Sequence, residues 1–292
     1  MTGKQQAPTR IALVTGREMA KPDPESHLLV AALHDLGIEA ELLPWQAECD
    51  WSAYPLVVVR TPWDYFRQRQ EFLCWARTVE SRTRLVNPLA VLHWNSHKAY
   101  LRALGAQGIP TVPTLWLAPD AADWAVQMDA LDWPVVVAKP AVSIGAIGTL
   151  RGAPGEGLMR EHVRQLLTEG DVMVQPYLDD IAREGELSLI YFGNRFSHAI
   201  CKRPRAGDYR VQDMYGGTNV PGSAPAAALQ LAEAILPRLP AATAYVRVDV
   251  VRQAGTWLLM EVEAIEPELF LPLAPGAAAR FAAHLRDLLS SG

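Results

Sequence analysis

Three carboxylates near the end of the chain have the spacing of a cation site. Glu261 and Glu263 are two residues apart in the run TWLLMEVEAIEPELFL, so in a β-strand both point to the same face. The preceding run AYVRVDVV also alternates, and in a hairpin of the two runs Asp249 would lie opposite the glutamates. Carboxylates crowded on one face repel each other unless cations lie between them. Mg²⁺ with phosphate groups suits such a face, so we predict a metal site of Asp249, Glu261 and Glu263; the alternative is a charged strand surface that faces solvent.

A second candidate site is the glycine-bearing loop within residues 135–150, VVVAKPAVSIGAIGTL. Its β-branched start predicts a buried strand, and Lys139 follows this start directly. The loop after the lysine contains Ser143, Gly145 and Gly148, and glycines let backbone N–H groups approach phosphate oxygens. The spacing is neither that of the dinucleotide-binding fingerprint nor that of a Walker A loop. We interpret the stretch as a site for the phosphates of ATP; the alternative is a hairpin loop with a surface lysine.

Two further segments could contact the same nucleotide. Lys98 lies in the first turns of a predicted helix that Asn95 or Ser96 would cap. The helix dipole disfavours a lysine there, which suggests phosphate binding, although a solvated lysine is the alternative. The predicted strand 172–174 breaks at Gln175 and Pro176, and a broken strand frees backbone groups that could hydrogen-bond an adenine edge. A plain exit from the strand is the alternative there.

Candidate substrate contacts follow the third predicted strand, in the run RTPWDYF. Because ligands of open α/β sheets lie beyond the carboxyl ends of the strands, Arg60, Asp64 and Tyr65 are candidates, and Arg60 suits a carboxylate. Arg210 lies in the polar, glycine-bearing segment 204–220, which is long enough to be functional or mobile. If Arg60 and Arg210 reach one cleft, they would clamp a small zwitterion from opposite sides. The alternative is that each arginine pairs with a nearby aspartate.

Strands and helices must position these residues, and the pattern predicts three α/β lobes. The first lobe has strands, a helix that ends before a glycine, and a later helix; these are residues 11–15, 38–45 and 56–59 for the strands and 25–36 and 69–80 for the helices. The last lobe has two hairpins and two helices. The hairpins are 186–202 and the pair of runs 244–251 and 256–271, and the helices are 226–239 and 277–289. We expect a substrate-side lobe over residues 1–93, a central lid lobe over 94–175 and a C-terminal lobe with the metal site over 176–292.

Composition excludes several classes of protein. The 292 residues are half hydrophobic and 20% charged, as in a globular enzyme, and the net charge of −5 argues against nucleic-acid binding. Cys49, Cys74 and Cys201 are far apart and form no metal-binding pair, which indicates free thiols in a reducing cytoplasm. The N-terminus is polar, and no apolar run is long enough for a signal peptide or a membrane span. We therefore expect a cytoplasmic enzyme with a small-molecule substrate and no membrane partner, and the sequence leaves a homo-oligomer open.

Taken in order, these features resemble the ATP-grasp superfamily over nearly the whole chain. The ordered set is Lys98, Lys139 with its glycine loop, the break at 175–178, Glu186, Arg203, and Asp249 with Glu261-x-Glu263. RTPWDY and GDYRVQDMYGG are similar to substrate loops of bacterial glutathione synthetases. The overall size and the MEVEAIEPELF ending resemble more closely the ATP-grasp cyclo-ligases of cycloserine biosynthesis, which close the ring of O-ureidoserine. The last metal ligand of the superfamily is usually asparagine, and Glu263 in its place leaves the number of metal ions open.

The resemblance implies an ATP-grasp fold with an open α/β lobe, a lid lobe and a mixed-sheet lobe. It also implies a role for each candidate residue. Those that would hold ATP are Lys98, Lys139, Ser143, Gly145, Gly148, Gln175, Pro176, Tyr177, Leu178 and Glu186; those that would hold Mg²⁺, two ions in the usual pattern, are Asp249, Glu261 and Glu263; and those that would contact the substrate are Arg60, Asp64, Tyr65, Arg210, Gly216 and Gly217. Arg203 and Lys139 would stabilise the charge that develops when a substrate carboxylate attacks the γ-phosphate of ATP.

The resemblance implies a ligase that forms a C–N bond through an acyl phosphate, with ring closure of one amino-acid-like substrate as one form of the reaction. Joining of two small substrates is the alternative within the same class. A kinase of the same fold and a non-catalytic nucleotide-binding protein are further alternatives. The complete set of Lys139, Arg203, Asp249, Glu261 and Glu263 argues against the non-catalytic protein.

Overall fold

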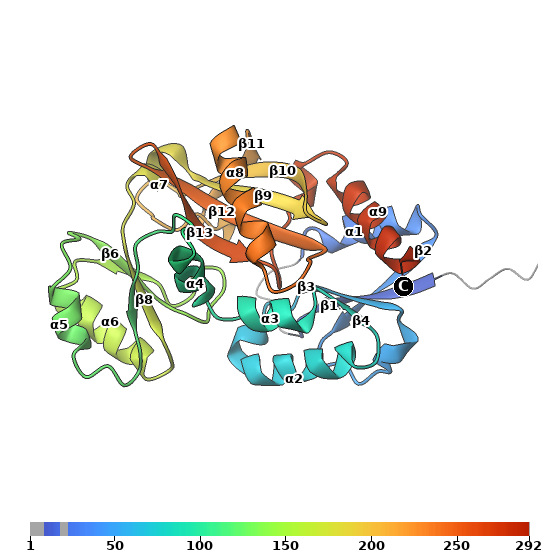
Figure 1. The fold of residues 1–292 in the computed structure, drawn as a ribbon, viewed down its shortest axis with the longest axis horizontal. Helices are drawn as coiled ribbons and strands as arrows, with labels where there is room; N and C mark the ends of the chain where they lie inside the picture. The colour runs from blue at the N-terminus through green and yellow to red at the C-terminus, as the bar shows by residue number, and fades with distance from the viewer. Residues whose placement is uncertain (1–8, 18–22, 292) are drawn as a thin grey trace, which may run out of the picture.

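The computed structural model describes residues 9–17 and 23–291, and its elements form three lobes, each built on one sheet (Figure 1). The N-terminal lobe has a parallel sheet in the order β2-β1-β3-β4. Parallel strands are buried on both faces, and accordingly every residue of β3 is buried. The elements of the lobe are β1 (Thr9–Thr15), α1 (Ser26–His34), β2 (Ile38–Pro44), β3 (Leu56–Thr61), α2 (Arg69–Glu80), β4 (Arg84–Val86) and α3 (Leu89–Asn95). The expected open α/β lobe is confirmed. Residues 1–8, part of the polar N-terminus in which we expected no signal peptide, lie outside the described residues.

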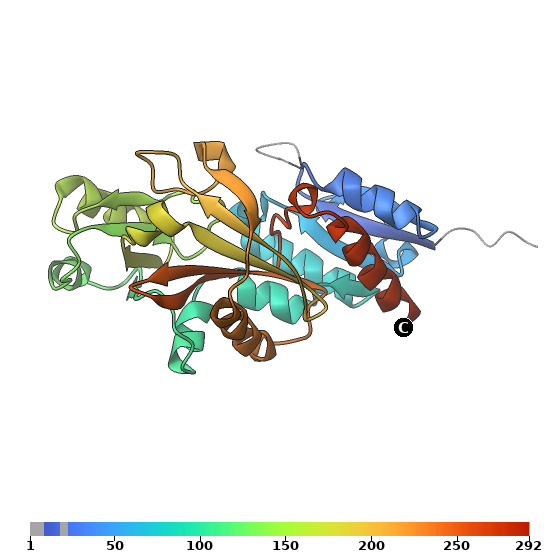
Figure 2. The ribbon, with the colours of Figure 1, turned by 90° about the horizontal axis from the view of Figure 1, so that it is seen from above.

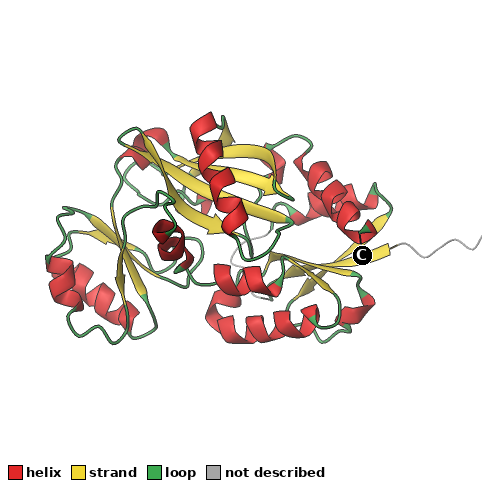
Figure 3. Ribbon diagram, viewed as in Figure 1, coloured by secondary structure: helices red, strands yellow, loops and turns green. Residues whose placement is uncertain are grey.

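The central lobe is a small antiparallel sheet in the order β5-β8-β6-β7, covered on one side by two helices (Figure 3). It has a hydrophobic core of its own, in which Val136 and Val174 of the sheet pack with Met159 and Val163 of a helix. Its elements are β5 (Leu115–Leu117), α5 (Trp124–Asp129), β6 (Val136–Pro140), β7 (Leu150–Gly152), α6 (Gly157–Leu167) and β8 (Val172–Pro176). This core covers one face of the sheet; on the other face Met173 of β8 belongs to the hydrophobic core of the C-terminal lobe.

The C-terminal lobe is a five-stranded antiparallel sheet in the order β11-β10-β9-β12-β13. Its strands are β9 (Glu186–Phe192), β10 (Arg195–Arg203), β11 (Thr218–Gly222), β12 (Tyr245–Gln253) and β13 (Thr256–Glu263), and its helices are α7 (Asp180–Glu184), α8 (Ala226–Ile235) and α9 (Ala277–Ser290). Short 3₁₀ turns lie at Trp51–Ala53, Tyr65–Gln68, Asp213–Tyr215, Leu236–Arg238 and Leu271–Leu273. As predicted, the last two strands pair so that Asp249 lies opposite Glu261.

The helix α4 (Tyr100–Ala106) belongs by packing to the C-terminal lobe. Tyr100 and Leu104 share a hydrophobic core with Val248 and Val262 of its sheet, although our expected boundary at residue 94 placed them in the central lobe. The expected cap is also wrong, because Asn95 ends α3 and Lys98 lies before α4 rather than in its first turns. The Asn95 amide instead donates to the Val262 carbonyl oxygen and accepts from Ala264 N–H, both at 2.7 Å. It thereby holds the end of β13, where the predicted metal ligands lie.

The helix α9 joins the two ends of the chain in one core. Phe281 and Leu285 of α9 pack with Leu29 and Leu33 of α1, and the two helices lie side by side in both views (Figures 1 and 2). The N-terminal and C-terminal lobes therefore share one hydrophobic core. Within the described ranges, no helix combines the length and apolarity that crossing a lipid bilayer requires.

Arg60 lies inside this shared core instead of in a substrate cleft. Its side chain is 1% exposed, its guanidinium contacts a Glu25 carboxylate oxygen at 3.2 Å, and it lies over the rings of Tyr245 and Phe281. Glu25 also accepts hydrogen bonds from the N–H groups of Leu269 and Leu271. Burial raises the pKa of Glu25 to about 7, and the Arg60 charge opposes that rise. The expected substrate contact through Arg60 is corrected: the residue pairs with an acid, and that acid is Glu25 rather than Asp64.

We expect Arg60→Met to lower the free energy of unfolding by about 3–5 kcal/mol, because it leaves Glu25 buried without a counter-charge. The double variant Arg60→Met/Glu25→Gln removes both charges and should lose less stability than Arg60→Met alone. Urea denaturation of the two variants and the wild type measures the difference. A stable Arg60→Met variant with a strongly raised KM for substrate would contradict the structural role.

Candidate active site

A cavity of about 280 Å³ lies where the three lobes meet. Its walls come from the central sheet and its loop, from the inner face of the C-terminal sheet, and from Trp63 and Tyr65 after β3. Most of the predicted nucleotide and metal residues line it: Lys98, Lys139, Ser143, Gly145, Gln175, Pro176, Tyr177, Leu178, Glu186, Asp249, Glu261 and Glu263. Tyr65 and Arg210 from the predicted substrate set line it too. Residues spread over more than 200 positions of the sequence thus meet at one place.

Asp249 is the centre of a buried charge network on the sheet. Lys202 Nζ donates to Asp249 Oδ2 at 2.8 Å. Arg247 donates from Nε to Oδ1 and from Nη2 to Oδ2, both at 3.0 Å. Ser188 Oγ adds a hydrogen bond at 2.7 Å. Burial alone would raise the pKa of Asp249, but Arg247 and Lys202 lower it well below its usual range. Asp249 is therefore held as a carboxylate that fixes two cations in the cavity wall.

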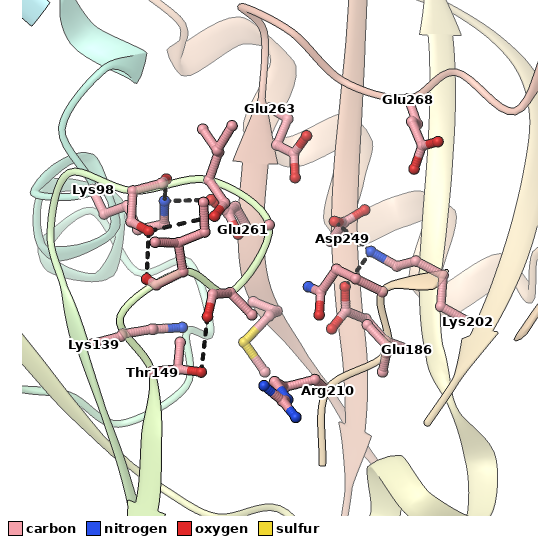
Figure 4. A pocket seen from close by; sticks show the side chains of 18 of the residues that line it. Lys98, Lys139, Thr149, Glu186, Lys202, Arg210, Asp249, Glu261, Glu263 and Glu268 are labelled. Carbon is pink, nitrogen blue, oxygen red and sulfur yellow. Dashed lines mark hydrogen bonds and ion pairs between the residues drawn. The ribbon is translucent and has the colours of Figure 1, made fainter. Parts of the chain in front are cut away.

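The cations of this network reach two further carboxylates. Lys202 Nζ lies 2.5 Å from a Glu186 oxygen (Figure 4). Arg247 contacts Glu263. Burial raises the pKa of Glu263 to about 7, since the opposing effect of Arg247 is smaller. The strand pairing explains the arrangement, because Lys202 is the cross-strand partner of Glu186 and Arg247 that of Glu263.

Two lysines lie on the opposite side of the cavity, at the glycine loop. Lys98 Nζ contacts Glu261 and the Ser143 carbonyl oxygen, both at 2.8 Å (Figure 4). Lys139 has no hydrogen bond or ion pair with any residue that the structure describes, and burial lowers its pKa. Its ammonium is therefore available to an anionic ligand. This fits the prediction of a phosphate site.

The glycine loop is closed by its own side chains and by the segment 204–220, here called the strap. Ser143 Oγ donates to the Ile147 carbonyl oxygen at 2.7 Å, and the Thr149 and Tyr209 hydroxyls lie 2.8 Å apart, which joins the loop to the strap. Gly145 lines the cavity with a φ of +56°. Gly148, predicted to contact ATP, does not line the cavity; a Cβ at its position would approach Pro140 Cδ to 3.1 Å. Its role is to let the loop turn against β6.

Gly216 and Gly217, two predicted substrate contacts in the strap, are not part of the cavity wall. A Cβ at Gly217 would lie 2.1 Å from the Val211 carbonyl oxygen, so this glycine permits the close turn of the strap, and Gly216 has a φ of +84°. Arg210 does line the cavity, but Asp208 binds it through two hydrogen bonds of 3.0 and 2.8 Å. For Arg210, the structure therefore shows the alternative that we named, a pair with a nearby aspartate.

Asp64 also has a structural role in place of the predicted substrate contact. Its carboxylate accepts hydrogen bonds from Trp45 Nε1, Gln46 Nε2 and the Arg17 N–H at 2.7–3.0 Å. These bonds tie the end of β3 to the ends of β1 and β2. Trp63 and Tyr65, on either side of Asp64 in the chain, are the residues of this loop that line the cavity.

Arg203 was predicted as the catalytic cation, but its neighbour Lys202, and not Arg203, lies in the cavity wall. Arg203 is exposed and does not line the cavity, whereas Lys202 is buried and does. Successive side chains of a strand point to opposite faces, so only one of the two can face Glu186. The alternation of side chains along the strand could have identified Lys202. Glu186 was expected in the site, and its cross-strand partner beyond the Gly193-Asn194 turn is Lys202. Arg247 was likewise missed, although it shares a strand face with Asp249.

A divalent metal would find its donors at the end of β13. Among the residues described, no three carboxylate, histidine or cysteine side chains are close enough to form a metal cage. Mg²⁺, however, is usually held by one or two protein carboxylates together with phosphates and water. Glu261 and Glu263 line the cavity from β13 and fit that need, while Asp249 can join only if Lys202 or Arg247 releases one of its oxygens.

Comparison with known proteins identifies the family. The family model for the N-terminal domain of D-cycloserine synthetase DcsG matches residues 11–87. The cycloserine biosynthesis protein DcsG of Streptomyces lavendulae is 32% identical over 306 residues, which cover 96% of this chain and 98% of that protein. This chain belongs to the DcsG family. The crystal structure of D-cycloserine synthetase DcsG matches with a TM-score of 0.86 at 30% identity, covering 96% of this chain and 99% of that one.

More distant structures share the fold of the DcsG family. The D-alanine–D-alanine ligase of Bacillus anthracis has a TM-score of 0.71 at 15% identity, with 97% of this chain and 98% of that chain covered. A RimK domain ATP-grasp protein of Sphaerobacter thermophilus has a TM-score of 0.67 at 20% identity, covering 96% of this chain and 99% of that chain. The predicted ATP-grasp fold and the predicted ligase enzyme are thus confirmed.

Lys202→Ala and Arg203→Ala form a matched pair that tests the corrected assignment. We expect Lys202→Ala to lower ligase turnover by about 10²–10³-fold, because a fixed cation in a water-poor site is lost. Arg203→Ala removes a cation of the same strand on the opposite face and should retain near wild-type turnover. Steady-state ADP release measures both, and Lys202→Arg serves as a charge-preserving variant if the alanine variant folds poorly. An equal loss in the two alanine variants would refute the one-residue shift.

Proposed function

We propose that this DcsG-family ligase uses ATP and Mg²⁺ to activate the carboxylate of a small amino-acid-like substrate, and that it closes the isoxazolidinone ring of O-ureidoserine. The observation that carries the proposal is the pairing of two cations, Lys202 and Arg247, with Asp249 in the wall of a cavity that also contains the free ammonium of Lys139. The family relationship over the whole chain supports cyclisation over other ligase reactions.

ATP enters this proposal as a co-substrate held across the cavity. Lys98 and Lys139 neutralise its phosphates beside the glycine loop, where Ser143 and Gly145 line the wall. Gln175 to Leu178 lie at the end of β8 and offer backbone groups and apolar surface to adenine, and Glu186 lies where it can accept from the ribose. Gln175 is fixed for this task, since its amide nitrogen donates to Thr114 Oγ1 at 2.9 Å.

Glu261 and Glu263 are the proposed ligands of Mg²⁺, with Asp249 as a further candidate. When bound, the metal neutralises phosphate charge and polarises the transferred group. With Glu263 already paired to Arg247, metal binding at Glu263 has to compete with that contact. Whether one or two ions bind therefore depends on how far Arg247 moves toward the substrate.

The cations of the network act on the substrate. As the substrate carboxylate attacks the γ-phosphate, Arg247 and Lys202 stabilise negative charge on the reacting oxygens, because both are already oriented and desolvated. The nitrogen bonded to the ether oxygen of the same molecule then attacks the acyl phosphate, so that the ring C–N bond forms and phosphate leaves. Water removes the carbamoyl group from that nitrogen as CO₂ and ammonia, which gives the isoxazolidinone. The protein supplies no nucleophile in this scheme, so catalysis rests on positioning and charge stabilisation.

Incubation with ATP, Mg²⁺ and the D or L form of O-ureidoserine tests the proposal. We expect ADP and phosphate in equal amounts, together with a product whose mass and retention are those of authentic cycloserine. Omission of O-ureidoserine and replacement of Glu261 by Gln are the controls, and each should abolish product. ADP formation without phosphate would indicate a kinase, and turnover that requires a second amino acid would indicate a two-substrate ligase.

A further inference from the structure

One carboxylate in the cavity is left without a counter-charge. Glu266 lies in the loop after β13 and lines the cavity, and its carboxylate has no ion pair and no hydrogen bond with any other residue that the structure describes. The four other carboxylates of the charge network each contact a lysine or an arginine; these are Glu186, Asp249, Glu261 and Glu263. Glu266 differs from these four carboxylates in having no such contact.

The loop that carries Glu266 is fixed at its backbone. Trp63 Nε1 donates to the Glu266 carbonyl oxygen at 3.1 Å, and Arg247 Nη1 donates to the Glu268 carbonyl oxygen at 2.9 Å. The N–H groups of Leu269 and Leu271 are held by the carboxylate of Glu25. The backbone that carries the Glu266 side chain is therefore held by residues of the N-terminal and C-terminal lobes.

The surroundings of Glu266 favour a cationic ligand. Burial and the nearby charges of Glu263 and Glu261 raise its pKa to about 8, and the Lys98 charge only partly opposes this rise. The rings of Trp63, Tyr65 and Phe270 line the same cavity. Aromatic rings beside a carboxylate attract an alkylammonium group, since the ring faces carry negative potential.

We propose that Glu266 binds the α-ammonium group of the amino-acid substrate, so that the substrate lies with its ammonium at Glu266 and its carboxylate toward Arg247 and Lys202. This rests on the proposed function and adds the residue that selects a zwitterion over a simple carboxylic acid. It also explains why an acid is kept unpaired at this position: the ligand supplies the missing charge. Arg60 and Arg210, the clamp expected from the sequence, are replaced in this role by groups of the C-terminal lobe.

A comparison of two substrates with three proteins tests the inference. The substrates are O-ureidoserine and 3-(ureidooxy)propanoate, which lacks only the amino group, and the proteins are the wild type, Glu266→Gln and Glu266→Asp. The kinetic constants come from ADP release at saturating ATP, with the propanoate measured as a competitive inhibitor if its turnover is too slow. Glu233→Gln, which changes an exposed carboxylate of α8, is the matched control.

We expect Glu266→Gln to lower kcat/KM for O-ureidoserine by about tenfold to a hundredfold, mainly through KM, as for loss of a charged hydrogen bond. The constants for the propanoate should change little, so the preference for the amino compound collapses, and Glu266→Asp should retain part of it. Affinity for ADP should be unchanged in both variants.

Equal losses for the two substrates would overturn the inference, and a raised requirement for Mg²⁺ alongside them would make Glu266 a metal ligand. An unchanged preference in Glu266→Gln would overturn it as well. Absence of turnover by the wild type with O-ureidoserine is a different result, because it rejects the proposed function itself.

Discussion

Compensation of buried charge is the constraint on which this molecule depends. Lys202, Arg247 and Asp249 are each less than a tenth exposed, and a buried charge that lost its partner would cost several kcal/mol. The partners come from β9, β10, β12 and β13, so the pairing of four strands is fixed by charge as well as by apolar packing. A slip of one residue in any of them would turn these side chains to the opposite face. The same contacts that hold the sheet in register also aim two cations into the cavity.

The hydrophobic cores connect the three lobes to different degrees. The N-terminal and C-terminal lobes share a core, and the loop with Glu266 is tied between them by Glu25 and Trp63. The central lobe has its own core and carries Lys139 and the glycine loop. Lys202, Arg247 and Glu266, which we assign to the substrate, therefore lie on the C-terminal lobe. Of the two lysines that we assign to the phosphates, Lys139 lies on the central lobe and Lys98 does not.

Local patterns in the sequence were sufficient for most of the fold. Alternation predicted the β12–β13 hairpin and the register of Asp249 with Glu261, and apolar runs predicted β1 and β3. The same patterns placed most of the nucleotide and metal residues, because these lie at strand ends or in a glycine loop. Alternation also favours Lys202 over Arg203 as the residue that faces the cavity. This becomes clear when Glu186 and its cross-strand partner are considered together.

What the sequence could not supply is the identity of partners far apart in the chain. Arg60 at the end of β3 has the position of a ligand contact, but its partner Glu25 and the rings that cover it come from other elements. Asp64 is similar, since Trp45 and Gln46 meet it only after the parallel sheet has formed. Conversely, Glu266 has no local signature, and its lack of a counter-charge is visible only when the paired acids around it are known.

The packing of α9 on α1 has a consequence for how the chain matures. Ile11 and Leu33 are synthesised before the central lobe, yet their core is completed by Phe281 and Leu285, which are synthesised after it. Domains generally fold in the order in which they leave the ribosome, and here the first one emerges with an apolar face still open. That face stays uncovered until α9 has left the ribosome. Slow elongation or termination before α9 would therefore leave the N-terminal lobe with an exposed apolar face.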